Sequence, residues 1–103
     1  MTTAHLTDLR NALEANHWRI VGDLPGDEDR VVGVWQIARP DGSNRLDIEF
    51  AGDPLFGGGP IEASSYCYLK EHPRIDLYFA RIGRSWTAKL AEFMGDLNGA
   101  ASD

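Results

Sequence analysis

The sequence contains only one cysteine, Cys67, among 103 residues, so no disulfide can form within the chain. A single free thiol is typical of proteins in a reducing compartment. No apolar run approaches the roughly 18 residues that a membrane-spanning helix needs. The N-terminal segment also lacks the basic start and apolar core of a signal peptide. We therefore expect a cytoplasmic protein that does not act on a membrane.

The sequence has few basic residues. It contains 10 lysines and arginines and 16 aspartates and glutamates, which gives a formal net charge of −6. An acidic chain repels phosphate groups, and small nucleic-acid-binding domains are usually basic. We therefore expect no nucleic-acid partner. The apolar fraction of 43% and the charged fraction of 25% are ordinary for a globular protein. The length predicts a single domain over residues 1–103.

A glycine-rich stretch from Gly52 to Glu62 invites comparison with a phosphate-binding loop, but the required residues are missing. A P-loop places Lys and Ser or Thr after its last glycine and then begins a helix. Here Gly57–Gly59 is followed by Pro60 and a β-type run. We interpret the stretch as a long mobile connection between two strands. Its apolar tip, Leu55–Phe56, is expected to fold back on the core rather than meet a partner.

Paired metal ligands and catalytic motifs are also absent. His5, His17 and His72 are spread over a predicted helix, strand and turn, whereas a zinc site needs ligands at short spacing. The acidic turn Asp27–Asp29 lacks the spaced oxygens and the glycine of a calcium loop. No serine stands in a nucleophile motif. The sequence thus predicts no catalytic residue, metal or cofactor, and it favours a protein that is not an enzyme without deciding that question.

Two segments do repeat apolar residues with the 3.6-residue period of a helix. The first predicts a helix over about residues 3–15, with Asn16 in the left-handed position at its end. The second predicts a helix over about residues 85–98, with Ser85 as N-cap and Asn98–Gly99 as stop. The apolar positions are Leu6, Leu9 and Leu13 in the first segment and Trp86, Leu90, Phe93 and Leu97 in the second.

Between these segments the apolar pattern alternates with the two-residue period of strands. Short links favour antiparallel neighbours, and Pro40–Ser43 gives the strongest hairpin signal. Since each helix has one apolar stripe, both are expected to cover one face of the sheet. We predict an α+β two-layer sandwich in the order α-β-β-β-β-β-α, with a five-stranded antiparallel meander. The predicted strands are about residues 17–22, 31–39, 45–51, 62–70 and 74–82.

This order of elements resembles that of frataxin-like proteins and, with an added helix, that of secretion-chaperone-like domains. The resemblance concerns architecture alone, and function does not follow from fold. Frataxin-like proteins bind iron through an acidic first helix and first strand. The first helix here has only Asp8 and Glu14 as acidic residues. The resemblance therefore implies no iron site.

Strand alternation predicts which side chains leave the core. In the last two strands Cys67, Leu69 and Leu77 are expected to point inward, so the tyrosines between them point to the helix-free face. Tyrosine is a common residue on a half-solvated sheet, but tyrosines also dominate binding hot spots. The pattern leaves open whether Trp18 and Trp35 belong to the core. The predicted binding residues are Tyr66, Tyr68, Tyr78, Arg19 and Lys70.

Two functional hypotheses follow from these observations. The first is an interaction module that binds a protein partner, or a second copy of itself, through the tyrosine-bearing sheet face. The second is a small-ligand-binding protein or minor enzyme with a pocket between residues 52–62 and the helices. An exposed apolar patch favours the first hypothesis, and a concave pocket with convergent polar groups favours the second.

Overall fold

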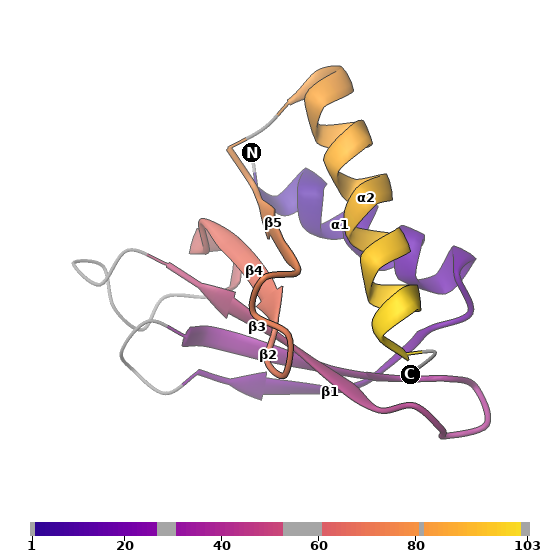
Figure 1. Cartoon of the computed structure of the whole chain (residues 1–103). Helices are drawn as coiled ribbons and strands as arrows, with labels where there is room; N and C mark the ends of the chain where they lie inside the picture. Colours follow the sequence, from indigo (N-terminus) through magenta and orange to yellow (C-terminus); the bar gives the residue numbers. More distant parts are fainter. Residues whose placement is uncertain (1, 27–30, 53–60, 81, 102–103) are drawn as a thin grey trace.

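The computed structural model describes residues 2–26, 31–52, 61–80 and 82–101 (Figure 1). The stretch Gly57–Gly59, its neighbours Leu55–Phe56 and the acidic turn Asp27–Asp29 lie outside the described residues. The predicted α+β class and the order α-β-β-β-β-β-α are confirmed. The elements are α1 (Thr2–Ala15), β1 (Arg19–Pro25), β2 (Val31–Ala38), β3 (Leu46–Ala51), the 3₁₀-helix η2 (Ile61–Ala63), β4 (Tyr66–Leu69), β5 (Asp76–Tyr78) and α2 (Gly83–Ala101).

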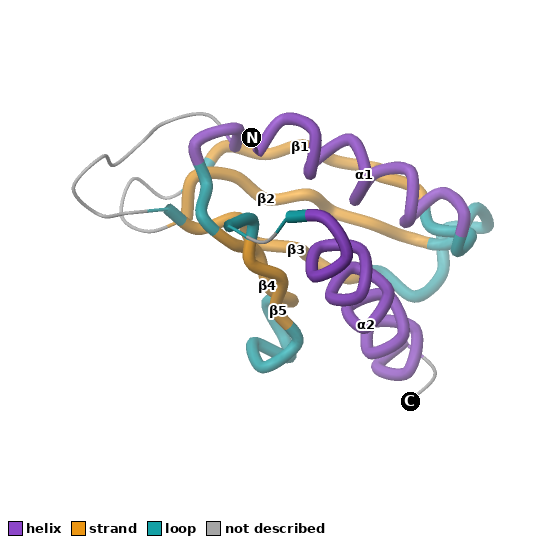
Figure 2. Tube along the Cα trace, turned by 90° about the horizontal axis from the view of Figure 1, so that it is seen from above, coloured by secondary structure: helices purple, strands orange, loops and turns teal. Residues whose placement is uncertain are grey.

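The strands form one antiparallel sheet in the order β1-β2-β3-β4-β5, so each strand pairs with its neighbour in sequence (Figure 2). The predicted hairpin joins β2 to β3. Its turn places Gly42 at φ 86°, a conformation that glycine adopts at little cost. The Arg39 backbone N–H donates to the Ser43 carbonyl at 2.8 Å. The Ser43 hydroxyl and N–H both donate to the Asp41 carboxylate, and these bonds lower the pKa of Asp41.

The core lies between the helices and the sheet face that they cover, and Figure 1 shows both helices on the same side of the sheet. Trp86 and Phe93 are buried, as the stripe of the second helix predicts, and Leu90 is half-buried. Trp18 and Trp35 both belong to the core, which answers the question that the sequence left open. The buried cluster contains Leu6, Leu9, Leu13, Trp18, Trp35, Ile37, Ile48, Phe50, Cys67, Leu69, Leu77, Phe79, Trp86, Phe93, Met94 and Leu97.

Three strands begin at later residues than the sequence predicts, and two of them are also shorter. The predicted strand 62–70 is wrong in its first half, because η2 occupies residues 61–63 and β4 begins only at Tyr66. The Ser64 hydroxyl donates to the Ile61 carbonyl at 2.5 Å, so a local side-chain bond closes this turn. The predicted strand 74–82 is reduced to β5, three residues long. The first strand begins at Arg19 instead of residue 17.

The first helix ends at Ala15, as predicted, but the residue that follows it and both ends of the second helix differ from the prediction. His17 (φ 64°), not Asn16, takes the left-handed position after α1. The Asn16 side-chain amide instead donates to the Ala12 carbonyl at 2.7 Å. The second helix begins at Gly83, so Ser85 lies inside its first turn and is not its N-cap. It continues past Asn98 to Ala101, so the predicted stop is also wrong.

Candidate functional site

The predicted binding tyrosines lie at the end of the sheet formed by β4 and β5. Cys67 and Leu69 of β4 and Leu77 of β5 are buried in the core. Because side chains alternate along a strand, Tyr66, Tyr68 and Tyr78 share the opposite face. Tyr66 and Tyr68 are half-buried, and Tyr78 is 45% exposed. The three rings therefore belong to the sheet surface rather than to the core.

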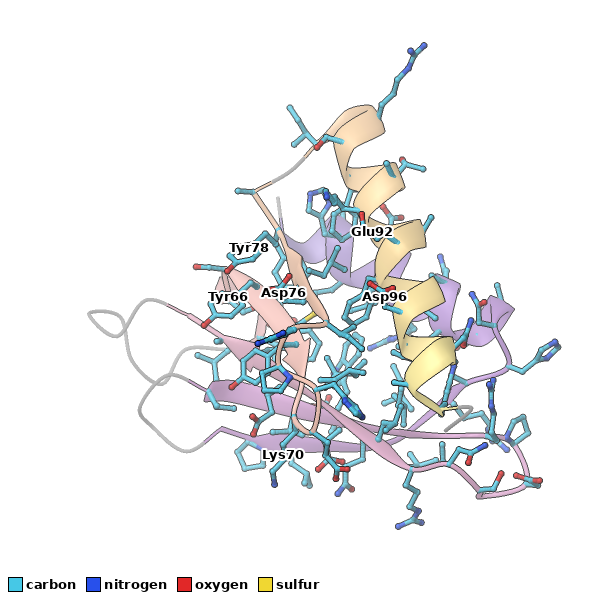
Figure 3. The ribbon with its side chains drawn as sticks, in the orientation of Figure 1. Tyr66, Lys70, Asp76, Tyr78, Glu92 and Asp96 are labelled. Carbon is cyan, nitrogen blue, oxygen red and sulfur yellow. The ribbon has the colours of Figure 1, made fainter. Side chains whose placement is uncertain are left out.

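The three rings form one continuous group, which we call the tyrosine cluster. Tyr66 stands directly opposite Tyr78 in the β4–β5 ladder. Their ring centroids are 4.9 Å apart and their planes differ by 16°, so the rings stack (Figure 3). The Tyr66 and Tyr68 centroids are 5.9 Å apart with an angle of 33°. Stacked rings hold one another in place, so this surface is ordered before any partner arrives.

Two carboxylates flank the tyrosine cluster. In the ladder Glu49 of β3 stands opposite Tyr68 on one side, and Asp76 of β5 stands opposite it on the other. Neither acid was among the predicted binding residues, although strand alternation puts both on the outward face. A cationic group over the Tyr68 ring would meet negative charge from both neighbours. The site is therefore suited to an apolar or cationic surface and disfavours an anionic one.

The two predicted cationic residues have different surroundings. Lys70 is exposed and directly follows β4, and its backbone N–H donates to the Asp47 carbonyl at 3.0 Å. It therefore lies next to the tyrosine cluster in the sheet. Arg19 lies on β1, at the opposite edge of the sheet from β5. The structure does not bring Arg19 together with the tyrosines, and its side chain lines a separate cavity beside α1.

The last strand, β5, presents part of its backbone away from the sheet. The Leu69 N–H donates to the Ile75 carbonyl at 3.1 Å, and the Phe79 N–H donates to the Ser65 carbonyl at 2.9 Å. In an antiparallel ladder the backbone groups that face one neighbour belong to alternate residues. The peptide groups of Asp76 and Tyr78 therefore point away from β4, along the outer edge of the sheet.

A small cavity of about 120 Å³ separates β5 from α2. Leu77 and Phe93 form its apolar part, and Figure 3 labels the acidic residues Asp76, Glu92 and Asp96 around it. The one ion pair within the described ranges joins Lys89 to Glu92 at 3.2 Å. No group of three or more histidine, cysteine or acidic side chains among those residues is arranged to hold a metal ion.

Cys67 does not supply a nucleophile to this region. Its side chain is fully buried in β4. Burial raises the pKa of the Cys67 thiol, and the charge of Asp76 raises it further. The thiolate is the reactive form of cysteine, so this thiol stays protonated and inert in the folded protein.

Comparisons of the chain with models of protein families, with curated proteins and with solved structures found no match. In the part of the chain that the structure describes, neither helix has the length and apolar character to cross a membrane. Function is therefore inferred from the geometry of the chain itself.

Proposed function

We propose that this protein is a non-catalytic interaction module that binds a protein partner, or a second copy of itself, through the tyrosine cluster. One observation carries the proposal: Tyr66 and Tyr78 stack across the last two strands, next to Tyr68, on the face opposite the core. A contiguous, outward-facing group of three aromatic rings, two of them stacked, is typical of a surface that binds another protein.

Tyrosine suits such a surface for a physical reason. Its ring offers a large contact area with few rotatable bonds, so little conformational entropy is lost on binding. Its hydroxyl remains available for hydrogen bonds at the rim of an interface. The stack between Tyr66 and Tyr78 already restricts both rings, which lowers the entropic cost of binding still further.

The edge of β5 supports the same proposal. In this proposal, a partner strand pairs with the outward peptide groups of Asp76 and Tyr78 and extends the sheet. In such strand addition, main-chain hydrogen bonds give affinity and neighbouring side chains give specificity. The tyrosine cluster and the flanking Glu49 would then select apolar and basic side chains on the added strand.

The second hypothesis, a ligand pocket between residues 52–62 and the helices, falls largely on residues 53–60, which lie outside the described residues. No contact among the described residues favours a pocket at that place. The interaction module is therefore the function that we propose for the chain.

The test replaces Tyr68 and Tyr78 by alanine, singly and together, with Val21→Ala as the matched control. Val21 is a large apolar residue of β1 that is 50% exposed, far from the tyrosines. Light scattering over a wide concentration range measures self-association. A photo-crosslinking residue at position 78, compared with one at position 21, captures other protein partners. We expect the tyrosine variants to weaken association by about 2 kcal/mol or more, roughly 30-fold in Kd.

The fold of each variant is checked by circular dichroism and a thermal melt. A double variant that keeps every association of the wild type would contradict the proposal. So would a wild-type chain that stays monomeric and crosslinks no better at position 78 than at position 21. If the double variant unfolds, the tyrosine face is part of the interior and the proposal is also wrong.

A further inference from the structure

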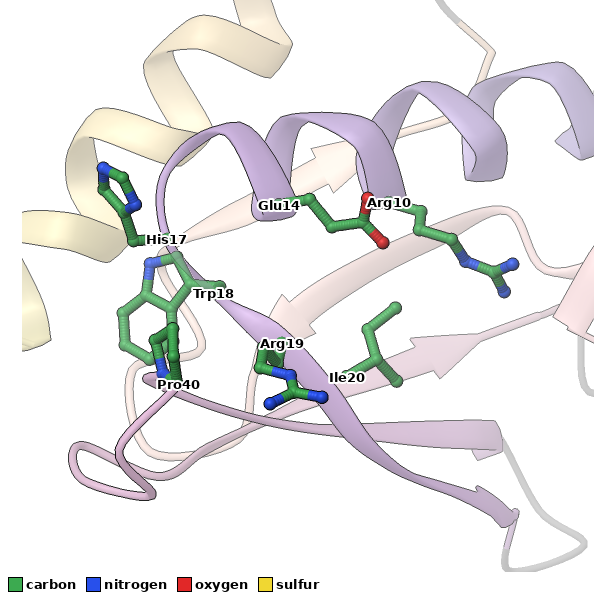
Figure 4. A pocket seen from close by; sticks show the side chains of 7 residues that line it. All are labelled: Arg10, Glu14, His17, Trp18, Arg19, Ile20 and Pro40. Carbon is green, nitrogen blue, oxygen red and sulfur yellow. The ribbon is translucent and has the colours of Figure 1, made fainter.

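A second candidate site lies at the opposite edge of the sheet from the tyrosine cluster. It is a cavity of about 550 Å³ between α1 and the start of β1 (Figure 4). Arg10 and Glu14 line it from the helix, and Trp18, Arg19 and Ile20 line it from the strand side. Small-molecule sites in proteins commonly have volumes of about 300–1,000 Å³. The cavity is therefore large enough for a small organic molecule.

The reversal of the chain after α1 creates this cavity. His17 takes a left-handed conformation, with φ 64°, and the Trp18 N–H returns to the Leu13 carbonyl at 2.9 Å. The chain then runs back beside the helix as β1. Figure 4 shows Arg10 and Glu14 on the helix that runs over the strand carrying Arg19 and Ile20. Side chains from both elements thus line one cavity.

The wall formed by Trp18 is held in a fixed position. Its indole N–H donates to Asn98 Oδ1 of α2 at 2.9 Å. The Arg39 guanidinium carbon lies 4.1 Å from the Trp18 ring centroid, and Arg39 Nη1 donates to the Asn16 carbonyl at 2.7 Å. Trp18 is only 1% exposed. Trp18 therefore forms a fixed base that needs little reorganisation when a ligand binds, and half-buried Ile20 and exposed Pro40 supply the accessible apolar surface of the cavity.

The charge of the cavity is opposite to that of the whole chain. Arg10 and Arg19 contribute two guanidinium groups against the single carboxylate of Glu14, in a chain of net charge −6. Lys89 and Glu92 form the only ion pair within the described ranges, so neither arginine is engaged by a carboxylate there. The Arg10 guanidinium carbon lies 5.4 Å from the Trp35 ring centroid, which restrains its side chain. Guanidinium groups match the geometry of carboxylate and phosphate oxygens.

We propose that this cavity binds a small organic anion, a carboxylate or phosphate ester with an apolar body. The positive charges of Arg10 and Arg19 attract the anionic group, and the apolar body rests against Ile20 and Pro40, which line the same cavity. Glu14 accepts a hydrogen bond from a hydroxyl or amine on the ligand and repels any ligand that brings a second negative charge to its side. This site is separate from the tyrosine cluster, so it does not depend on the proposed protein–protein function.

The experiment uses the full chain and four named probes of similar size. Phenyl phosphate and benzoate are the anions, benzyl alcohol is the neutral control and benzylamine is the cationic control. Binding is followed by the nuclear magnetic resonance signal of the Trp18 indole N–H and by thermal shift. We expect saturable changes at Trp18 with one or both anions and none with the two controls. A preference between the two anions identifies carboxylate or phosphate as the group that the site selects.

Three variants and one matched control test whether the charged residues of the cavity bind the anion. Arg10→Gln and Arg19→Gln should each weaken binding of the preferred anion about tenfold or more. Glu14→Gln should strengthen that binding several-fold, because it removes a repulsive charge. Arg84→Gln is the control, since Arg84 is an exposed arginine at the start of α2, outside this cavity. It should leave binding unchanged.

The proposal is overturned if benzyl alcohol shifts the Trp18 signal as strongly as the anions, because charge then plays no part. It is also overturned if Arg84→Gln weakens binding as much as Arg19→Gln, which indicates a general charge effect. If an arginine variant fails to fold, the titrations of the wild-type protein test the proposal by themselves. The proposal is overturned if neither anion causes a saturable change in the Trp18 indole N–H signal.

Discussion

Cys67 lies at the centre of β4, with Phe50 opposite it on β3 and Leu77 opposite it on β5. All three side chains are buried. Burial, and secondarily the Asp76 charge, raises the pKa of the Cys67 thiol. The residue therefore acts as a small apolar side chain in the core. Cysteine is usually a reactive residue, but burial in the core makes the Cys67 thiol unreactive.

We expect the thiol to resist modification in the folded protein. At mildly alkaline pH, a disulfide reagent should react with native Cys67 about 100-fold or more slowly than with urea-unfolded chain, because the reaction needs an opening of the core. A second consequence concerns stability. The pKa of Cys67 is higher in the folded state than in the unfolded state. The contribution of the protonated thiol to the free energy of unfolding is therefore complete below the ordinary pKa of 9.0 and is lost as pH rises above that value. Complete reaction of native protein at the unfolded rate would contradict the first statement, and a free energy of unfolding that does not fall as pH rises above 9.0 would contradict the second.

At the scale of elements, α2 shows packing prevailing over local propensity. Glycine in a helix costs about 1 kcal/mol relative to alanine, and Gly95 lies inside α2. The helix nevertheless continues to Ala101, because Met94 and Leu97 on either side of Gly95 are buried at 4% and 0% exposure. Burying two such side chains contributes about 1.5–3 kcal/mol each, which exceeds the cost of the glycine.

The same reasoning predicts the effect of truncating the centre of this helix. Phe93 is 1% exposed, so Phe93→Ala should lower the free energy of unfolding by about 3–5 kcal/mol. That is a large share of the roughly 5–15 kcal/mol typical of a domain. Glu92→Ala is the control, since its side chain is 62% exposed and its ion pair with Lys89 lies at the surface. Urea unfolding measures both. A Phe93→Ala protein as stable as the Glu92→Ala protein would contradict the observed packing of α2.

At the scale of the whole molecule, a small polar network joins the end of α1, the start of β1 and the end of α2. Asn98 accepts a hydrogen bond from the Trp18 indole and donates to Asn16 Oδ1 at 3.0 Å. A second link joins the helices, where the Trp86 indole N–H donates to Asp8 Oδ2 at 2.9 Å. These bonds connect residues 78 to 82 positions apart. They fix how the two helices sit over the sheet.

We therefore expect Asn98→Ala to cost about 1–3 kcal/mol of stability, because the buried Trp18 indole N–H loses its acceptor. Asn11→Ala is the control, since Asn11 is exposed on α1. Urea unfolding of a double-mutant cycle with Trp18→Phe isolates the bond. In the Trp18→Phe background, the cost of Asn98→Ala should fall. Equal costs in both backgrounds would mean that this hydrogen bond does not stabilise the fold.

Much of the fold could be predicted from local patterns. The stripes of α1 and α2, the hairpin at Pro40–Ser43 and the five-strand order all appear in the structure. Alternation also put Tyr66, Tyr68 and Tyr78 on the face opposite the core, because a two-residue period depends only on neighbouring residues. The boundaries were less predictable. The extent of the short β5 depends on hydrogen bonds that it makes with β4.

The sequence by itself therefore determined the two helices, the order of the strands and the faces of β4 and β5, since these follow from residue spacing along the chain. Only the tertiary structure decided where the elements meet. It buried Trp18 and Trp35, stacked Tyr66 on Tyr78, and put Arg19 in the lining of a cavity at the opposite edge of the sheet from the tyrosines. Contacts between residues far apart in sequence depend on how elements pack and on which strand lies at each edge, and no local period encodes either.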